Sequence, residues 1–219
     1  MDRIKKASLR EWLSVYFIMG SPNCSIEPEA VLEAAIRGGI TFFQFREKGN
    51  GRLHGQEKLS LAKNLQKICK SHSIPFIIND DIDLALELDA DGVHIGQEDE
   101  PAVEVRKKIG GKILGVSAHN LYEAKKAIAE GADYLGIGPI YPTATKEDAK
   151  PAQGLDFIKE LRQTGIDIPL VGIGGITAEN APPIIQAGAD GVSVISAISH
   201  AENPEKAAGL LRKAVHSFK

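Results

Sequence analysis

The sequence has few cysteines, no long apolar run and no excess of positive charge. Its two cysteines, Cys24 and Cys69, have no metal-ligand spacing, so we expect free thiols in a reducing compartment. No apolar stretch approaches the ~20 residues that a membrane-spanning helix needs, and the N-terminus lacks the apolar region of a signal peptide. A formal net charge of -3 argues against nucleic acid or an anionic membrane as a partner. These absences favour a cytoplasmic protein whose main partner is neither nucleic acid nor a membrane.

The composition fits one globular domain with a large buried core. The 219 residues are 43% hydrophobic and 25% charged, which is close to the average for globular proteins. This length matches the size class of α/β barrels, and two small domains are the less favoured alternative. We therefore interpret residues 1–219 as a single domain in which residues 1–13 form a short N-terminal extension.

Short apolar runs alternate with amphipathic stretches along the whole chain. The runs are apolar throughout, which indicates strands that are buried on both faces, as in a parallel sheet covered by helices. The repeated order predicts right-handed βα units. The predicted strands are Ser14–Met19, Ile40–Phe45, Pro75–Ile78, Gly92–Ile95, Ile113–Val116, Tyr134–Ile137, Pro169–Ile173 and Gly191–Ile195. The predicted helices are Pro28–Arg37, Leu53–Lys70, Val103–Ile109, Leu121–Ala129, Leu155–Gln163, Ala178–Ala187 and Glu205–His216.

A short internal repeat precedes every second predicted strand. Asp89–Gly92, Gly131–Tyr134 and Gly188–Gly191 share an Ala-Asp pair, and Gly38–Thr41 occupies the equivalent place earlier in the chain. A glycine there can adopt the left-handed conformation that ends a helix. The third and seventh strands instead follow Ile-Pro pairs, in which proline blocks continuation of a helix. Eight units with this two-unit echo predict a closed (β/α)8 barrel rather than an open sheet.

Glycines follow the predicted seventh strand, in the segment Gly172–Thr177. Glycines between a strand and a helix let backbone N–H groups approach an anion, and a helix N-terminus adds a favourable dipole. Ile195–Ile198 offers amide and hydroxyl groups after the eighth strand. Because barrels of this class often bind phosphate between these two strands, the segments predict a phosphate site. Plain turn glycines are the structural alternative.

Two cations leave the predicted second strand. Alternation along a strand places Gln44, Arg46 and Lys48 on one side and Phe45 and Glu47 on the other. In a barrel the first side is the interior and its mouth. An unpaired buried charge is very costly, so cations there need anions. Either a neighbouring carboxylate or a bound anionic ligand would supply them.

Carboxylates follow the next two strands, with Asp80 after the third and Asp99 after the fourth. Mg²⁺ commonly takes one or two protein carboxylates and completes its shell with water and substrate phosphate. Together with Arg46 and Lys48, such a metal would form a diphosphate site. To Asp81 we assign mainly a structural role as the cap of the following helix.

A long loop begins after the sixth strand and runs to Gln153. Loops of this length in compact domains are often lids or binding loops. Thr143 and Thr145 offer hydroxyl groups, and Lys146 offers a cation. A solvated charged loop without a ligand is the alternative.

Two further polar residues lie at strand ends. Ser117 could donate a hydrogen bond to a phosphate or cap the helix that follows. His94 could polarise a ligand, act as a base, or be a hydrogen-bonded core histidine.

These motifs, in this order, resemble the thiamine phosphate synthase family over nearly the whole chain. Several motifs in the right order are far more specific than any one alone. The matching segments are Gln44–Lys48, Asn79–Asp80, His94–Asp99, Gly115–Ser117, Gly138–Lys146, Gly172–Ile176 and Ile195–Ser196. The N-terminal segment and the stretch Gly49–Gly55 have no clear counterpart.

The resemblance implies a transferase that joins 4-amino-2-methyl-5-hydroxymethylpyrimidine diphosphate to a thiazole phosphate, carboxylated or not, and releases diphosphate and thiamine phosphate. It also implies Mg²⁺ as cofactor, held by Asp80 and Asp99. The residues implied for the pyrimidine diphosphate are Gln44, Arg46, Lys48, Asn79, Ser117 and Lys146, of which Arg46, Lys48 and Lys146 would be catalytic. Phe45, Glu47 and Ala144 are implied as further substrate-binding residues. Those implied for the thiazole phosphate are Thr143, Thr145, Gly175, Ile195 and Ser196.

The chemistry implied by this resemblance agrees with what the sequence lacks. A dissociative step through a pyrimidinylmethyl cation needs positioned charge but no protein nucleophile or general base. The sequence has no nucleophile elbow, Walker loop or cysteine–histidine metal motif. The alternatives are a related thiazole tautomerase, a non-catalytic sensor of a phosphate ligand, and a sugar-phosphate epimerase or aldolase. The sequence leaves the oligomeric state open, although barrel helices can form the faces of a homo-oligomer.

Overall fold

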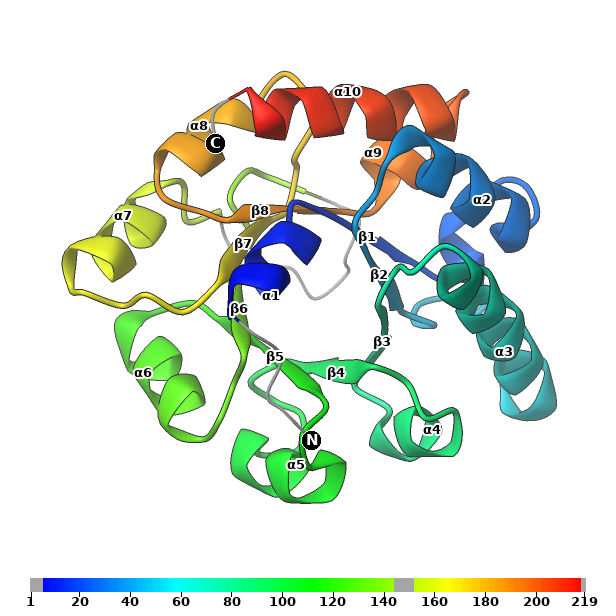
Figure 1. Ribbon diagram of the computed structural model, residues 1–219, viewed down its shortest axis with the longest axis horizontal. Helices are drawn as coiled ribbons and strands as arrows, with labels where there is room; N and C mark the ends of the chain where they lie inside the picture. The colour runs from blue at the N-terminus through cyan, green and yellow to red at the C-terminus, as the bar shows by residue number, and fades with distance from the viewer. Residues whose placement is uncertain (1–5, 144–151, 218–219) are drawn as a thin grey trace.

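The structure is a computed structural model that describes residues 6–143 and 152–217. Within these residues, eight parallel strands close into a barrel in which each strand pairs with the next and β8 pairs with β1 (Figure 1). The predicted (β/α)8 barrel is therefore confirmed. The limits of the single domain, 1–219, stay a prediction. The strands are β1 Val15–Met19, β2 Phe42–Phe45, β3 Phe76–Asn79, β4 Gly92–Ile95, β5 Ile113–Ala118, β6 Tyr134–Ile137, β7 Leu170–Ile173 and β8 Gly191–Val194.

Helices surround the barrel, and Figure 1 shows α1 lying across the centre of the ring of strands. No helix in the described ranges is long and apolar enough to cross a membrane. The helices are α1 Lys6–Trp12, η1 Ser21–Asn23, α2 Pro28–Gly38, α3 Gly55–Ser71, α4 Ile82–Glu87, α5 Ala102–Ile109, α6 Leu121–Ala129, α7 Asp156–Gln163, α8 Pro182–Gln186, α9 Ser196–Ser199 and α10 Pro204–His216.

Several element limits differ from those that the sequence predicts. Strand β2 begins at Phe42 rather than Ile40, because the N–H of Ile40 bonds to the carbonyl of Ala35 and closes the turn that ends α2. Helix α8 is shorter than predicted and begins at Pro182, since proline fits the first turn of a helix, where an N–H needs no partner. Helix α4 escaped prediction because six residues are too few to show a helical period. Asp81 caps it as expected, accepting a hydrogen bond from the Leu84 N–H at 3.0 Å.

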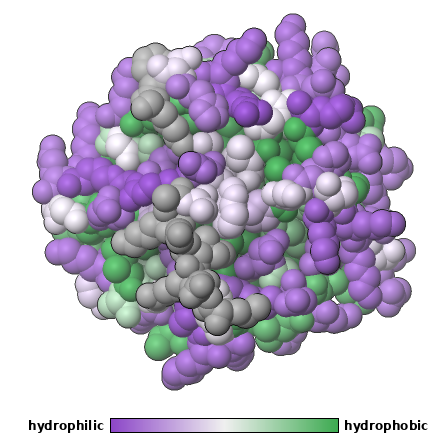
Figure 2. Space-filling model, in the orientation of Figure 1, coloured by the Kyte–Doolittle hydropathy of each residue, from purple (hydrophilic) through white to green (hydrophobic). Residues whose placement is uncertain are grey.

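The core has two layers, one inside the barrel and one between the strands and the helices. Inside the barrel, Tyr16, Phe42 and Tyr134 meet edge to face. Leu9 of α1 and Leu13, both almost fully buried, close the end of the barrel at which the strands begin. Figure 2 shows that the outer face on this side is largely hydrophilic, with hydrophobic residues in scattered areas.

The internal repeat anchors the barrel through its aspartates. Each aspartate immediately precedes an even-numbered strand. Its carboxylate accepts a hydrogen bond from the N–H of the first or second residue of the preceding odd-numbered strand. These pairs are Asp91 with the Phe76 N–H (2.8 Å), Asp133 with the Leu114 N–H (2.9 Å) and Asp190 with the Leu170 N–H (2.8 Å). At the fourth place the hydroxyl of Thr41 accepts from the Val15 N–H at 2.9 Å. The repeat therefore ties neighbouring strands together at their N-terminal ends.

The turns that precede these aspartates have the expected left-handed backbone. Gly39, Gly131 and Gly188 have φ values of 99°, 97° and 108°. Asp89 takes the place of glycine in the remaining copy, with a φ of 47°. An aspartate tolerates this conformation better than most residues, because its short polar side chain can bond locally.

We expect Asp133→Ala to lower the free energy of unfolding by about 2 kcal/mol, because the change strips a buried N–H of its acceptor. The same carboxylate also binds the Arg106 guanidinium at 2.5 Å. Urea unfolding followed by circular dichroism measures the loss. The matched control is Asp156→Ala, whose side chain is 94% exposed and whose pair with Lys159 should contribute little. Equal stability of the two variants would contradict an anchoring role for the repeat.

Candidate active site

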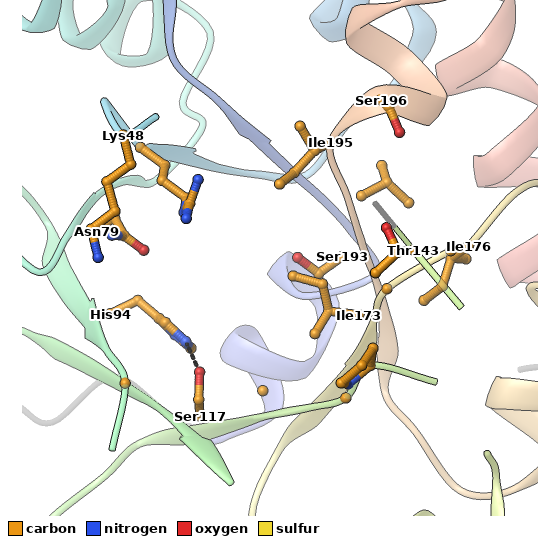
Figure 3. A pocket seen from close by; sticks show the side chains of 18 of the residues that line it. Lys48, Asn79, His94, Ser117, Thr143, Ile173, Ile176, Ser193, Ile195 and Ser196 are labelled. Atoms are coloured by element: carbon orange, nitrogen blue, oxygen red, sulfur yellow. Dashed lines mark hydrogen bonds between the residues drawn. The ribbon is translucent and has the colours of Figure 1, made fainter. Parts of the chain in front are cut away.

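A cavity of about 570 Å³ opens at the C-terminal ends of the strands. Figure 3 shows Lys48 and Asn79 on one side of it and Thr143 and Ser196 on the other. The predicted site residues that line this cavity are Arg46, Lys48, Asn79, Asp80, Asp99, Ser117, Thr143, Gly175, Ile195 and Ser196. The predicted residues Ala144, Thr145 and Lys146 lie outside the described residues.

Arg46 and Lys48 differ in how their charges are balanced. The Arg46 side chain is buried (8% exposed), and its guanidinium has no ion-pair partner among the residues that the structure describes. Lys48 is more exposed and contacts the carboxylate of Asp80. The internal ion pair that the sequence left open is thus present for Lys48 and absent, in the described part, for Arg46. A buried cation without a carboxylate favours an anionic ligand.

The other members of this segment point elsewhere. Phe45 packs in the outer core and does not line the cavity. The Glu47 carboxylate accepts hydrogen bonds from the Ser21 hydroxyl (2.5 Å) and the Leu53 N–H (2.8 Å), which fixes the loop after β2. Gln44 faces the barrel interior and donates from Nε2 to the Tyr16 hydroxyl at 2.7 Å. The predicted alternation along the strand is therefore confirmed, but only Arg46 and Lys48 reach the cavity.

Asp80 and Asp99 come together at the mouth, although they follow different strands. Burial, reinforced by Asp99 and opposed by Lys48, raises the pKa of the Asp80 carboxyl. Asp80 also has a left-handed backbone, with a φ of 60°, which is uncommon outside glycine and concentrates at functional sites. Asp99 accepts a hydrogen bond from the Gly96 N–H at 2.7 Å, so its carboxylate is held in place.

The opposite side of the cavity is built on a tight glycine turn after β7. Gly174 and Gly175 have φ values of 98° and 63°, and a Cβ on Gly175 would meet the Pro142 carbonyl at 2.6 Å. Asn180 holds the turn, because its Nδ2 donates to the Gly175 carbonyl at 2.9 Å. Within the described ranges, the N–H groups of Gly175 and Ile176 donate to no protein atom. This arrangement leaves backbone donors available to an anion.

The structure also places Ser193 in the cavity, a residue that the sequence did not single out. The hydroxyl of Ser193 is buried, lacks a hydrogen-bond partner among the described residues, and points into the cavity (Figure 3). Its inward position on β8 is set by the two-residue period of the strand, which the sequence shows without showing what surrounds it. His94 bonds to Ser117 at 3.0 Å and to Tyr134 at 2.9 Å, so it is a hydrogen-bonded histidine that also lines the cavity.

Comparison with known proteins agrees with this geometry. The family model described as thiamine monophosphate synthase matches residues 15–198. The thiamine-phosphate synthase of Bacillus velezensis is 62% identical over 95% of this chain and 93% of its own. That of Geobacillus kaustophilus is 58% identical over 99% and 98%. The solved structure of thiamine phosphate pyrophosphorylase from Pyrococcus furiosus superposes with a TM-score of 0.87 at 35% identity, over 96% of this chain and 98% of that one.

Proposed function

Because the chain belongs to the thiamine monophosphate synthase family and is a transferase of thiamine biosynthesis, we propose that its cavity joins 4-amino-2-methyl-5-hydroxymethylpyrimidine diphosphate to a thiazole phosphate. The reaction releases diphosphate and forms thiamine phosphate. The thiazole nitrogen replaces the diphosphate on the pyrimidine methylene carbon. Both substrates are anionic, and the two sides of the cavity offer separate anion sites.

The buried Arg46 guanidinium is the observation that carries this proposal. It has no carboxylate partner in the described part of the chain, and it lines the same cavity as Lys48 and the Asp80–Asp99 pair. A diphosphate carries about three negative charges near neutral pH, by extension from the second pKa of phosphate. Such a ligand would give Arg46 the partner that its burial demands. A plain phosphate sensor or a tautomerase would not need this second anion site.

The residues at the mouth fit a magnesium ion. Asp80 and Asp99 are two nearby carboxylates, and the buried Asp80 Oδ2 contacts the Lys48 ammonium without the geometry of a regular hydrogen bond. Among the described residues no group of three or more histidine, cysteine or acidic side chains gathers as a metal site. Two carboxylates suffice for Mg²⁺, which completes its shell with water and substrate phosphate. When bound, Mg²⁺ would neutralise charge on the leaving diphosphate.

The chain's own residues then act by position and charge. Arg46 and Lys48 balance the negative charge that grows on the departing diphosphate, and Asn79 and Ser117 offer hydrogen bonds from neighbouring strand ends. Departure of the diphosphate leaves a cation that the electron-rich aminopyrimidine stabilises. Capture of that cation by the thiazole nitrogen needs no protein nucleophile. The dissociative route therefore needs only positioned charge and hydrogen bonds, which the side chains of this cavity can supply.

The thiazole phosphate belongs at the opposite side, over the Gly174–Gly175 turn and the start of α9. The Ser196→Ala variant is expected to raise the KM for thiazole phosphate about tenfold with little change in kcat, because a contact of equal strength in ground and transition states affects KM alone. Steady-state kinetics at saturating pyrimidine diphosphate measure this. Ser199→Ala, on the same helix and outside the cavity lining, is the control. Unchanged kinetics in Ser196→Ala would remove this hydroxyl from the site.

Diphosphate release measured with each substrate alone, and with both together, tests the proposal as a whole. We expect release only when both substrates and Mg²⁺ are present, and none after chelation. Running the assay with the carboxylated and the simple thiazole phosphate distinguishes which the enzyme prefers. Full activity after thorough removal of metal would falsify the magnesium part. Conversion of thiazole phosphate alone into an isomer would support the tautomerase instead.

A further inference from the structure

A chain of hydrogen bonds crosses the barrel interior from β2 to the cavity. Gln44 Nε2 donates to the Tyr16 hydroxyl at 2.7 Å, which bonds to the Tyr134 hydroxyl at 2.8 Å. Tyr134 bonds to His94 Nδ1 at 2.9 Å, and His94 Nε2 bonds to the Ser117 hydroxyl at 3.0 Å (Figure 3). Of these five hydrogen-bonded residues, only Ser117 and His94 line the cavity. The remaining members lie beneath it and are buried.

Counting hydrogen atoms fixes the direction of this chain. The Tyr16 hydroxyl accepts from Gln44, so its own hydrogen goes to Tyr134, its other partner among the described residues. Tyr134 accepts that bond and must pass its hydrogen to His94 Nδ1. Nδ1 is then an acceptor, so the ring is neutral and its hydrogen lies on Nε2. Nε2 donates to Ser117, whose hydroxyl hydrogen is left to point into the cavity.

The protonation of the two tyrosines agrees with this count. Burial raises the pKa of the Tyr16 hydroxyl and of the Tyr134 hydroxyl, so each keeps its single hydrogen. In a buried chain of this kind each bond polarises the next, and an unsatisfied member is costly. Reversing the donor-to-acceptor direction would therefore require every hydroxyl hydrogen and the His94 tautomer to change together, beginning with a flip of the Gln44 amide.

Two glycines make room for the chain. A Cβ on Gly115 would meet the Tyr134 ring at 2.1 Å and His94 Nδ1 at 2.4 Å. A Cβ on Gly136 would lie 3.1 Å from His94 Cε1. Both residues lie on strands whose other positions are mostly larger apolar residues. The two glycines therefore leave the space in which the His94 and Tyr134 rings contact each other.

We propose that this chain of hydrogen bonds holds His94 as the neutral Nε2–H tautomer and thereby makes Ser117 a hydrogen-bond donor to the substrate diphosphate. The part concerning substrate rests on the proposed function. A diphosphate offers only acceptors, so a serine whose hydrogen pointed back at His94 would turn a lone pair toward an anion. Tyr16, Tyr134 and His94 are thus positioning residues for the coupling reaction, and Ser117 is the group that touches the ligand.

The tautomer can be observed directly in the unmodified protein. Long-range proton–nitrogen NMR on protein labelled with ¹⁵N-histidine distinguishes the two neutral tautomers from imidazolium, and loss of signals in His94→Gln identifies His94 among the six histidines. We expect the Nε2–H form at neutral pH, both alone and with inorganic diphosphate and Mg²⁺. A dominant Nδ1–H form or imidazolium overturns the proposal. This measurement needs no turnover, so it stands apart from any failure of the proposed function.

Breaking the chain tests what it does for the reaction. Tyr134→Phe removes the hydroxyl between Tyr16 and His94 and keeps the ring, and it should give a mixture of His94 tautomers. Because the Ser117 bond strengthens as charge grows on the diphosphate, kcat should fall about tenfold while the KM for thiazole phosphate stays unchanged. Tyr16→Phe, one bond further from Ser117, should have a smaller effect of the same kind. It also provides the test if Tyr134→Phe does not fold.

The matched control is Tyr122→Phe, which removes a tyrosine hydroxyl that is exposed on α6. Tyr134→Phe kinetics and tautomer equal to those of this control would overturn the proposal. So would an equal rise in the KM of both substrates, which indicates general distortion of the cavity. If the wild-type protein shows the predicted tautomer but releases no diphosphate, the proposed hydrogen-bond chain stands and the proposed function is wrong.

Discussion

Replacing Arg46 with methionine is expected to lower kcat/KM for the pyrimidine diphosphate about 10³-fold, the size of effect seen when one preorganised donor is removed from a developing anion. The guanidinium lines the cavity, and it is buried without a carboxylate partner in the described part of the chain. Its charge is therefore available to an anionic ligand, which we propose is the leaving diphosphate. The KM for thiazole phosphate should change little, because we propose that this substrate binds at the far side of the cavity, near Ser196.

The same substitution should leave the ligand-free protein as stable as before, or more stable. A buried charge without a partner costs free energy, and methionine of similar length fills the space without that cost. Urea unfolding in the absence of substrates measures the change. Loss of activity with retained or increased stability is what a residue kept for ligand binding shows. A side chain kept for the fold would behave in the opposite way.

Arg106→Met provides that opposite case as a control. The Arg106 guanidinium donates to the carbonyls of Gly131 (2.8 Å) and Lys112 (2.7 Å) and pairs with Asp133. Its loss should lower the free energy of unfolding and leave the activity of each folded molecule unchanged. If Arg46→Met were the destabilised variant and retained its kcat/KM, the diphosphate site would have to be placed elsewhere.

Much of this architecture could be predicted, because strong local patterns determine it. Apolar runs predicted the strands, and the Ala-Asp repeat before every second strand favoured a closed barrel over an open sheet. The convergence of Arg46 with Asp80 follows from the fold alone, since β2 and β3 are neighbours and all strands open at one end. What alternation could not decide was which cation pairs with a carboxylate. That depends on side-chain length and loop path, which bring Lys48 rather than Arg46 to Asp80.

The interior chain could not be predicted, for a different physical reason. Tyr16 and Tyr134 are 118 residues apart, and their hydroxyls meet only because the barrel closes and packs both rings edge to face against Phe42. Each tyrosine lies in a strand whose sequence is almost wholly apolar, so the sequence gives no sign that the two hydroxyl groups are hydrogen-bonded to each other. The glycines that admit His94 look like ordinary strand breaks until the rings beside them are seen. Cross-barrel contacts of this type depend on packing rather than on local pattern.

The second large effect concerns Asp80. Asp80→Asn is expected to lower the rate of coupling about 10³-fold and to raise the Mg²⁺ concentration that the reaction needs, because it removes one of two predicted ligands. Asparagine tolerates the left-handed backbone at this position, where φ is 60°, so the change tests charge rather than folding. Asp99→Asn should behave in the same way. Asp83→Asn, on the exposed side of α4, is the control and should not.

Stability gives a readout of Asp80 that is independent of turnover. Burial, with Asp99 adding to it, raises the pKa of the folded-state carboxyl above its unfolded value. Between these two values the folded protein binds more protons than the unfolded one, so the free energy of unfolding falls as pH rises through that window. The penalty is complete above the folded-state pKa. Without metal, Asp80→Asn should therefore be more stable than the native protein at neutral pH, and this advantage should disappear in acid.

Magnesium should reverse the order of stability. A ligand at about 100 times its Kd stabilises a protein by about 2.7 kcal/mol, provided that it binds only the folded state. Thermal unfolding of the native protein should thus shift upward with added Mg²⁺, more so with inorganic diphosphate present, whereas Asp80→Asn should shift little. Mg²⁺ brings charge to the place where two carboxylates repel, and the variant has lost that repulsion together with the site. Equal shifts in the two proteins would mean that the ion, if it acts at all, is held by other residues.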